Sequence, residues 1–310
     1  MKTLRIALDR YLAFRRSLGF KLRDHASALP RFIAFLESKG AEFVTTELAL
    51  DWAQEPQQVT QAHHARRLCM VRGFTRYLQA SDPRTQVPPQ GVLPGRPQRA
   101  QPYIYSNEEI LDIIREASRL HPSGALRPHT YSTVFGLLAV TGMRVSEIAA
   151  LDRADVDLKQ GVLTVRKSKF NRTRLLPVHG STQRELQDYA RRRDKLIPVR
   201  ASDGFFISDC GVRLNPWMVR YTFARISRSI GLRKETDRYG PRLHDLRHTF
   251  AVKTLTSWYR DGINPEQRLP LLSAYLGHVK VSDTYWYLSA VPELLGALST
   301  RLDTFLGDIS

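Results

Sequence analysis

Residues 81–102 interrupt the apolar patterning of this 310-residue chain. Their sequence, SDPRTQVPPQGVLPGRPQRAQP, is dominated by proline, glycine, glutamine and arginine, and its few apolar residues have no helical or strand spacing. A segment of this composition is extended and fairly stiff. Because the chain is long enough to bury two hydrophobic cores, the segment predicts a linker between two domains, at residues 1–80 and 103–310.

The first predicted domain is entirely helical. Its apolar residues recur at helical spacing up to breaks at Gly19 and Gly40. Thr45 or Thr46 can cap a short helix, and Thr60 can cap a longer one.

The helix expected after Thr60 has a basic polar face. Four of its polar positions are Arg66, Arg67, Arg72 and Arg76. A solvated face with a chance bias in charge would have the same composition. We favour a face that lies along the phosphates of DNA.

The charge of the whole chain also favours a polyanionic partner. There are 47 lysine and arginine residues against 30 aspartate and glutamate residues, which gives a net charge of +17. The alternative is a basic surface that serves only solubility.

Cys69 and Cys210 are far apart and have no metal-ligand spacing. With a charged N-terminal stretch and no apolar run of membrane length, we expect a soluble, cytoplasmic protein with no membrane partner.

The second predicted domain begins with a helix-capping pattern, Ser106 followed by Glu109. The next run, TYSTVFGLLAVTG, is apolar enough to form a buried helix. Two β-branched runs, GVLTVRK and RTRLLPV, predict a hairpin. Its turn contains Lys169, and Lys167 is the alternative because the register of the turn is open. A lysine at such a turn is usually only solvated.

Helical patterns return at residues 181–193 and 217–230. The second of these mixes Trp217 and Tyr221 with Arg225 and Arg228. It is a candidate for entering the major groove of DNA, although an amphipathic core helix explains the aromatic residues equally well.

A candidate phosphate-binding arginine follows the buried helix. In LLAVTGMRVSEIAAL, Gly142 lets the backbone turn sharply and could aim Arg144 into a cleft. Arginine suits this task because its planar fork donates two hydrogen bonds to phosphate and stays protonated. Glu147 follows Arg144 by three positions and would either hold an arginine or backbone in place or be a surface glutamate.

The stretch from His244 to Tyr287 supplies the remaining side chains for phosphate chemistry. Arg247 and His278 are further candidate donors to a phosphodiester, whose negative charge grows in the transition state. Tyr287 could attack phosphorus through its phenolic oxygen and keep the phosphate as a covalent ester. Tyr285 is the rival nucleophile, but on a helix the two tyrosines face different directions, so only one can reach the phosphate.

These motifs resemble the tyrosine recombinase (phage integrase) family. Its pattern is an arginine in a TGxRxSE box, a hairpin lysine, a His-x-x-Arg box, a Gly-His pair and a late tyrosine. The corresponding residues here, in the same order, are Arg144, Lys169, His244, Arg247, His278 and Tyr287. The resemblance implies a mostly α fold with a small β-sheet, in which a helical core-binding (SAM-like) domain and an α+β catalytic domain form a C-shaped clamp on DNA.

The resemblance also implies a mechanism. Arg144, Arg247 and His278 would bind the non-bridging oxygens, Lys169 would protonate the departing 5′ oxygen, and His244 would assist proton transfer at Tyr287. A 3′-phosphotyrosyl intermediate and a Holliday junction follow. We expect no cofactor, neither metal nor ATP.

The expected partners are a specific double-stranded DNA site and further copies of the chain. We predict a homo-tetramer on DNA, a monomer or weak oligomer when free, and a role for other recombinases of the same element. Leucines after Tyr287 recur at helical spacing, and we favour docking of this tail on a neighbouring subunit over capping of its own core. The late motifs, LPLLSAYLGH and DTYWYLSAVPELL, resemble those of recombinases carried by transposons and other mobile elements. Alternatives are a dimer-resolution recombinase, a type IB topoisomerase and a non-catalytic DNA-binding protein.

Overall fold

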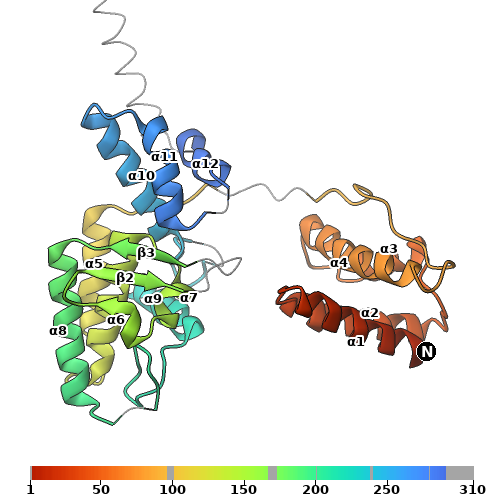
Figure 1. The fold of residues 1–310 in the computed structure, drawn as a ribbon, viewed down its shortest axis with the longest axis horizontal. Helices are drawn as coiled ribbons and strands as arrows, with labels where there is room; N and C mark the ends of the chain where they lie inside the picture. Colours follow the sequence, from red (N-terminus) through yellow and green to blue (C-terminus); the bar gives the residue numbers. More distant parts are fainter. Residues whose placement is uncertain are drawn as a thin grey trace, which may run out of the picture. The chain divides into compact units, whose positions relative to one another are not determined.

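The computed structural model describes residues 2–95, 101–166, 173–199, 201–237, 240–278 and 280–290. The chain divides into two compact units, residues 1–100 and 101–310 (Figure 1). Each unit has a separate hydrophobic core.

The first unit consists of helices around one core. They are α1 (Lys2–Ser17), α2 (Arg23–Ser38), α3 (Thr46–Gln54) and α4 (Gln61–Gln79). The side chain of Thr45 accepts a hydrogen bond from the Leu48 N–H, and that of Thr60 accepts one from the His63 N–H. These caps fix the starts of α3 and α4, as the sequence indicates.

The segment expected to be a linker from residue 81 packs on the first unit over part of its length. Thr85 is buried, and the Gln86 N–H donates to the Val44 carbonyl over 2.8 Å. Leu93 packs against the helical core. The sequence does not predict these contacts, because single residues that anchor a polar segment have no periodicity.

The second unit is mostly helical with a small antiparallel sheet, which confirms the expected fold class. Its helices before the sheet are α5 (Asn107–Ser118), α6 (Leu126–Thr141) and α7 (Val145–Ala150), followed by a 3-10 turn (Arg153–Asp155). Its strands are β1 (Val156–Asp157), β2 (Val162–Val165) and β3 (Arg174–Pro177), in the order β1-β2-β3. Its later helices are α8 (Gly180–Leu196), α9 (Pro216–Ser229), α10 (Asp245–Arg260), α11 (Pro265–Leu276) and α12 (Ser282–Ala290).

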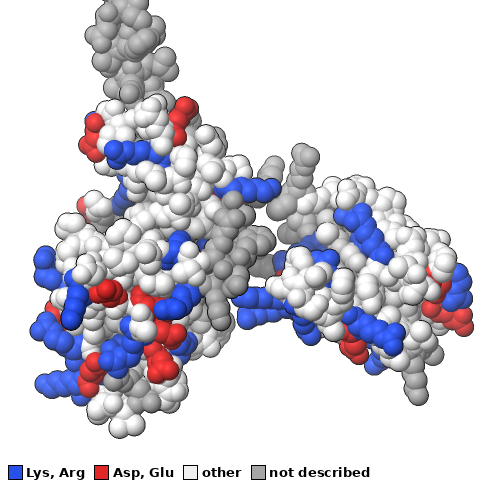
Figure 2. Space-filling model, viewed as in Figure 1, with Lys and Arg blue, Asp and Glu red and all other residues white. Residues whose placement is uncertain are grey.

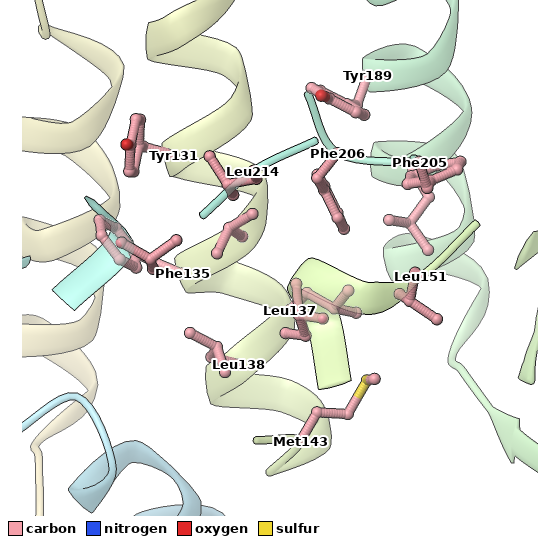
Figure 3. Packing of buried hydrophobic residues seen from close by; sticks show 14 of the residues in the cluster. Tyr131, Phe135, Leu137, Leu138, Met143, Leu151, Tyr189, Phe205, Phe206 and Leu214 are labelled. Atoms are coloured by element: carbon pink, nitrogen blue, oxygen red, sulfur yellow. The ribbon is translucent and has the colours of Figure 1, made fainter. Parts of the chain in front are cut away.

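Helix α6 runs through the core of the second unit, as its apolar sequence predicts. Tyr131, Phe135 and Leu138 on this helix are buried, and Phe205 and Phe206 pack with Tyr189 of α8 (Figure 3). Ser106 caps α5 through the expected capping box with Glu109. This core holds the end of α6, which leads through Gly142 to Arg144 at the start of α7.

The predicted hairpin is formed by β2 and β3, with Val165 opposite Arg174. Its two candidate lysines, Lys167 and Lys169, lie outside the described residues, as does the tail from residue 291.

Helices α10, α11 and α12 share a smaller apolar cluster. Leu255 of α10 and Leu269 and Leu276 of α11 are fully buried in it, together with Tyr287 of α12. This packing brings His244, His278 and Tyr287 into one region although they are distant in sequence.

Candidate active site

Arg144 lies where α6 turns into α7. Gly142 ends α6 with φ 60°, and a Cβ there would come within 2.7 Å of Phe250 Cδ1. Glycine is therefore required both by the left-handed backbone and by the close packing. The Arg144 side chain is 29% exposed, and its Nη2 donates to the Gly277 carbonyl over 3.3 Å.

Arg247 is the buried arginine of the site. Its side chain is 2% exposed, and its Nη1 and Nη2 donate to the carbonyls of Gly142 and Leu276, each over 2.7 Å. Burial, and next the positive charge of Arg144, lower the pKa of Arg247 to about 10. The guanidinium therefore remains cationic at neutral pH and joins the Arg144 turn to the end of α11.

Glu147 is buried and does not behave as a surface glutamate. Its Oε1 accepts from Arg144 Nη1 over 2.8 Å, and its Oε2 accepts from Arg174 Nη2 over 2.8 Å. Burial tends to raise the pKa of Glu147, but the bond and charge of Arg174, followed by Arg144, bring it down to about 2. The carboxylate is therefore ionised and holds two arginines. This is the first of the two roles that the sequence left open for Glu147, the other being a surface glutamate.

His278 follows the turn that ends α11. Gly277 has φ 70° there, and a Cβ on it would lie 2.6 Å from Arg174 Nη1. His278 Nδ1 is 2.8 Å from Oγ1 of the buried Thr284, and this hydrogen bond orients the imidazole.

Tyr287 is buried inside the site, whereas Tyr285 faces outward. Tyr287 is 2% exposed and Tyr285 is 49% exposed. The Tyr287 Oη is hydrogen-bonded to His248 Nδ1 over 3.0 Å, and its ring is stacked with that of His278 at a centroid distance of 6.2 Å. Only Tyr287 therefore points into the cluster of histidines and arginines.

His248 is the histidine bonded to the tyrosine, and His244 is its neighbour at a ring distance of 4.9 Å. Burial, and next His244, lower the pKa of His248 to about 4. His244 lies at the rim of the site, where part of its side chain is exposed. Desolvation by the surrounding protein, followed by the charge of Arg247, lowers the pKa of His244. Both imidazoles are therefore neutral at pH 7, and a neutral imidazole can accept a proton at one nitrogen.

The described part of the chain thus brings five of the six predicted catalytic residues into one region: Arg144, His244, Arg247, His278 and Tyr287. Lys169 lies outside the described residues. Sequence reasoning singled out neither Arg174 nor the role of His248. For His248 a signal was present, since it lies four positions after His244, on the same face of a helix.

The four candidate arginines of α4 have different surroundings. Arg66 and Arg76 are exposed and Arg72 is half-buried. Arg66 forms an exposed ion pair with Asp24. Arg67 is mostly covered, because its guanidinium lies 3.7 Å from the centroid of the Trp52 ring and donates to the Trp52 carbonyl. Arg66, Arg72 and Arg76 are therefore better placed than Arg67 to meet a ligand.

Helix α9 presents aromatic and basic side chains to solvent. Trp217 and Tyr221 are 63% and 47% exposed, and their rings stack at 5.5 Å. Arg225 and Arg228 are exposed farther along the helix. Trp217 and Tyr221 are therefore not core residues. The alternative interpretation, that packing in a core explains these aromatic residues, is wrong for both.

The exposed basic side chains are not confined to these two helices. Figure 2 shows lysine and arginine on the visible face of both units, with acidic side chains interspersed. Within the described ranges, no cluster of three or more potential metal-ligating side chains occurs. The same residues include no helix that is long and apolar enough to cross a membrane.

Comparisons with known proteins agree on one family. Residues 106–293 match the model of the phage integrase family. The chain is 48% identical over 307 residues to the Sinorhizobium fredii protein y4rB, which is named as an integrase/recombinase, and the match covers 98% of each chain.

Two solved structures have the same fold. The Tn1549 transposon integrase in complex with transposon right end DNA matches with a TM-score of 0.65 at 16% identity, over 96% of this chain and 99% of that one. The lambda integrase tetramer bound to a Holliday junction matches with a TM-score of 0.58 at 20% identity, over 89% and 77%. At these identities the likeness concerns the fold.

Proposed function

Because the chain belongs to the phage integrase family and is a tyrosine recombinase, we propose that it cuts and rejoins DNA through Tyr287. The observation that carries this proposal is the placement of the Tyr287 phenol. It is buried, bonded to His248 and stacked with His278, while Tyr285 on the same helix is exposed. Arg247 lies in the same region, because its Nη2 donates to the Leu276 carbonyl, two residues before His278.

The phosphodiester would be held by cations. Arg144, Arg247 and His278 donate to its non-bridging oxygens, where negative charge grows during attack. Loss of one such donor in comparable sites raises the barrier by about 3 kcal/mol. Glu147 keeps Arg144 in place.

The reaction is a transesterification. The bond from Tyr287 Oη to phosphorus forms as the bond from phosphorus to the 5′ oxygen breaks, which gives a 3′-phosphotyrosyl ester and a 5′ hydroxyl. Lys169 supplies the proton to the 5′ oxygen, and His244 assists removal of the phenolic proton. Attack by a 5′ hydroxyl of the partner duplex then reverses the step and forms a Holliday junction, with no ATP required.

The two units would grip the duplex from opposite sides, with residues 1–80 as the core-binding domain, residues 81–102 as a linker whose first part packs on that domain, and residues 103–310 as the catalytic domain. Arg66, Arg72 and Arg76 on α4, together with Arg225 and Arg228 on α9, are the phosphate contacts that their exposure favours. Recombination joins two duplexes, so four copies are expected around the junction, as the lambda integrase forms a tetramer.

The biological role we propose is movement of a mobile element by integration, excision or transposition. It is supported by the integrase/recombinase name of the 48% identical relative and by the transposon integrase fold. The proposed substrates are the DNA of the mobile element and the DNA of the chromosome, so the enzyme would act in the cytoplasm.

Covalent trapping tests the proposal. Nicked duplexes drawn from the DNA that flanks the gene are incubated with wild type, Tyr287→Phe and Tyr285→Phe, and the products are resolved under denaturing conditions. We expect a protein–DNA adduct with wild type and Tyr285→Phe, and none with Tyr287→Phe. An adduct that persists in Tyr287→Phe would refute the assignment.

A further inference from the structure

One arginine that the proposed mechanism does not use lies where three segments of the site meet. Arg174 begins β3, and its side chain is 11% exposed. Building on the function proposed above, we infer that Arg174 is a positioning residue, which fixes Arg144 and the end of α11 for attack on the phosphate.

The Arg174 guanidinium is held by three hydrogen bonds. Nη2 donates to Glu147 Oε2 over 2.8 Å, and Nη1 donates to Oε1 over 3.2 Å. Nε donates to the Tyr275 carbonyl over 2.9 Å. The fork-on-fork pairing with Glu147 fixes the plane of the carboxylate, which a lysine could not do.

The same carboxylate also holds Arg144. The Arg144 backbone N–H donates to Glu147 Oε2 over 2.9 Å, and its Nη1 donates to Oε1 over 2.8 Å. Because Arg174 compensates part of the Glu147 charge, Arg144 is not neutralised by its own partner. The three-residue cluster keeps positive charge for the oxygens of a phosphate.

The second link is to the segment that carries His278. Arg174 is bonded to the Tyr275 carbonyl and packs so closely against Gly277 that a Cβ there would lie 2.6 Å from Nη1. Arg144 donates to the Gly277 carbonyl as well. Removal of Arg174 would therefore loosen Arg144 and the turn before His278 together.

The test measures single-turnover adduct formation by the full chain on the nicked duplexes at saturating DNA. We expect Arg174→Gln to lower the rate about 100-fold and Arg174→Lys about 10-fold, less than or equal to the loss of a direct transition-state donor. Affinity for the duplex should change by less than about 2-fold, since Arg174 lies too deep to be a general phosphate contact.

Arg213→Gln is the matched control. Arg213 also donates to a carboxylate, that of Asp152, and to a backbone carbonyl, that of Leu151 over 3.2 Å. Its loss should lower the Tm without changing the rate of adduct formation at a temperature where the variant is folded.

A double variant separates positioning from support of the fold. If Arg174 acts by positioning Arg144 and the turn before His278, then Arg174→Gln should slow the reaction less in an Arg144→Gln background than in wild type, because one of the two groups that it positions is already absent. Additive losses accompanied by a lower Tm, or a wild-type rate in Arg174→Gln, would overturn the inference. Arg174→Lys carries the same test if the glutamine variant does not fold. Absence of a Tyr287 adduct in wild type would instead count against the proposed function.

Discussion

The Oη of Tyr287 lies 3.0 Å from Nδ1 of His248, the residue that directly follows Arg247 in α10. In the tautomer that carries its proton on Nε2, His248 accepts the phenolic hydrogen bond. The tyrosine is thus held beside the buried arginine by a neutral side chain, which adds no positive charge to the site.

His248→Phe should slow adduct formation without weakening DNA binding. The phenyl ring can keep the packing with Trp286 and Tyr287 that the imidazole makes, but it removes the hydrogen bond. Loss of one neutral hydrogen bond costs about 1 kcal/mol, which corresponds to a rate roughly 5-fold lower. Single-turnover trapping and a binding titration on the same duplex measure the two quantities. Equal rates in the two proteins would show that the bond has no part in the reaction.

Stability should fall as the pH is lowered from about 6.5 toward about 4. The pKa of His248 is lowered from 6.5 to about 4 by burial, with His244 as the next cause. Between these values the unfolded chain binds a proton that the folded protein does not bind, so the free energy of unfolding decreases with decreasing pH. His244, whose pKa is also lowered, adds to the same trend.

Urea unfolding at a series of pH values between 7.5 and 4.5 measures this trend, and His248→Gln is the comparison. The variant should lose less stability across the window than wild type because it lacks the titrating group. A steeper loss in the variant would contradict the assigned direction.

The parts of the site that the sequence predicts are those fixed by local chain geometry. Gly142 permits the turn that aims Arg144, and the two-residue spacing along α12 predicts that Tyr285 and Tyr287 face different directions, as they do. Both relationships lie within a few residues, so periodicity and the glycine signal are sufficient.

The parts that the sequence does not predict depend on contacts between distant segments. Arg174 meets Glu147 across 27 positions and Tyr275 across 101, and His248 meets Tyr287 across 39. Nothing in the local pattern distinguishes Arg174 from Arg172 or from an exposed strand arginine. Its role emerges only when β3, α7 and α11 are packed together.

Gly142→Ala should destabilise the second unit by about 2–3 kcal/mol. An alanine would need a left-handed backbone, at a cost of about 1 kcal/mol, and its Cβ would press on the rings and methyl groups of Phe250 and Leu276. Gly262→Ala is the control, because Gly262 has φ 71° but no atom lies within 4 Å of its Cβ. The control should show only the backbone cost. Thermal unfolding of both variants measures the difference, and equal losses would refute the packing argument.

Replacement of Arg76 and of Arg67 on α4 by glutamine should change different properties, DNA affinity for Arg76 and stability for Arg67. Arg76 is exposed, so Arg76→Gln should leave the Tm unchanged and reduce the slope of log affinity for duplex DNA against log salt by about 0.9, the value for one phosphate contact. Arg67 stacks on Trp52 and donates to its carbonyl, so Arg67→Gln should cost about 1–2 kcal/mol of stability. Binding titrations from low to high salt, with thermal unfolding of each variant, separate the two effects. If Arg76→Gln keeps the wild-type salt slope, α4 does not lie along the DNA at that position.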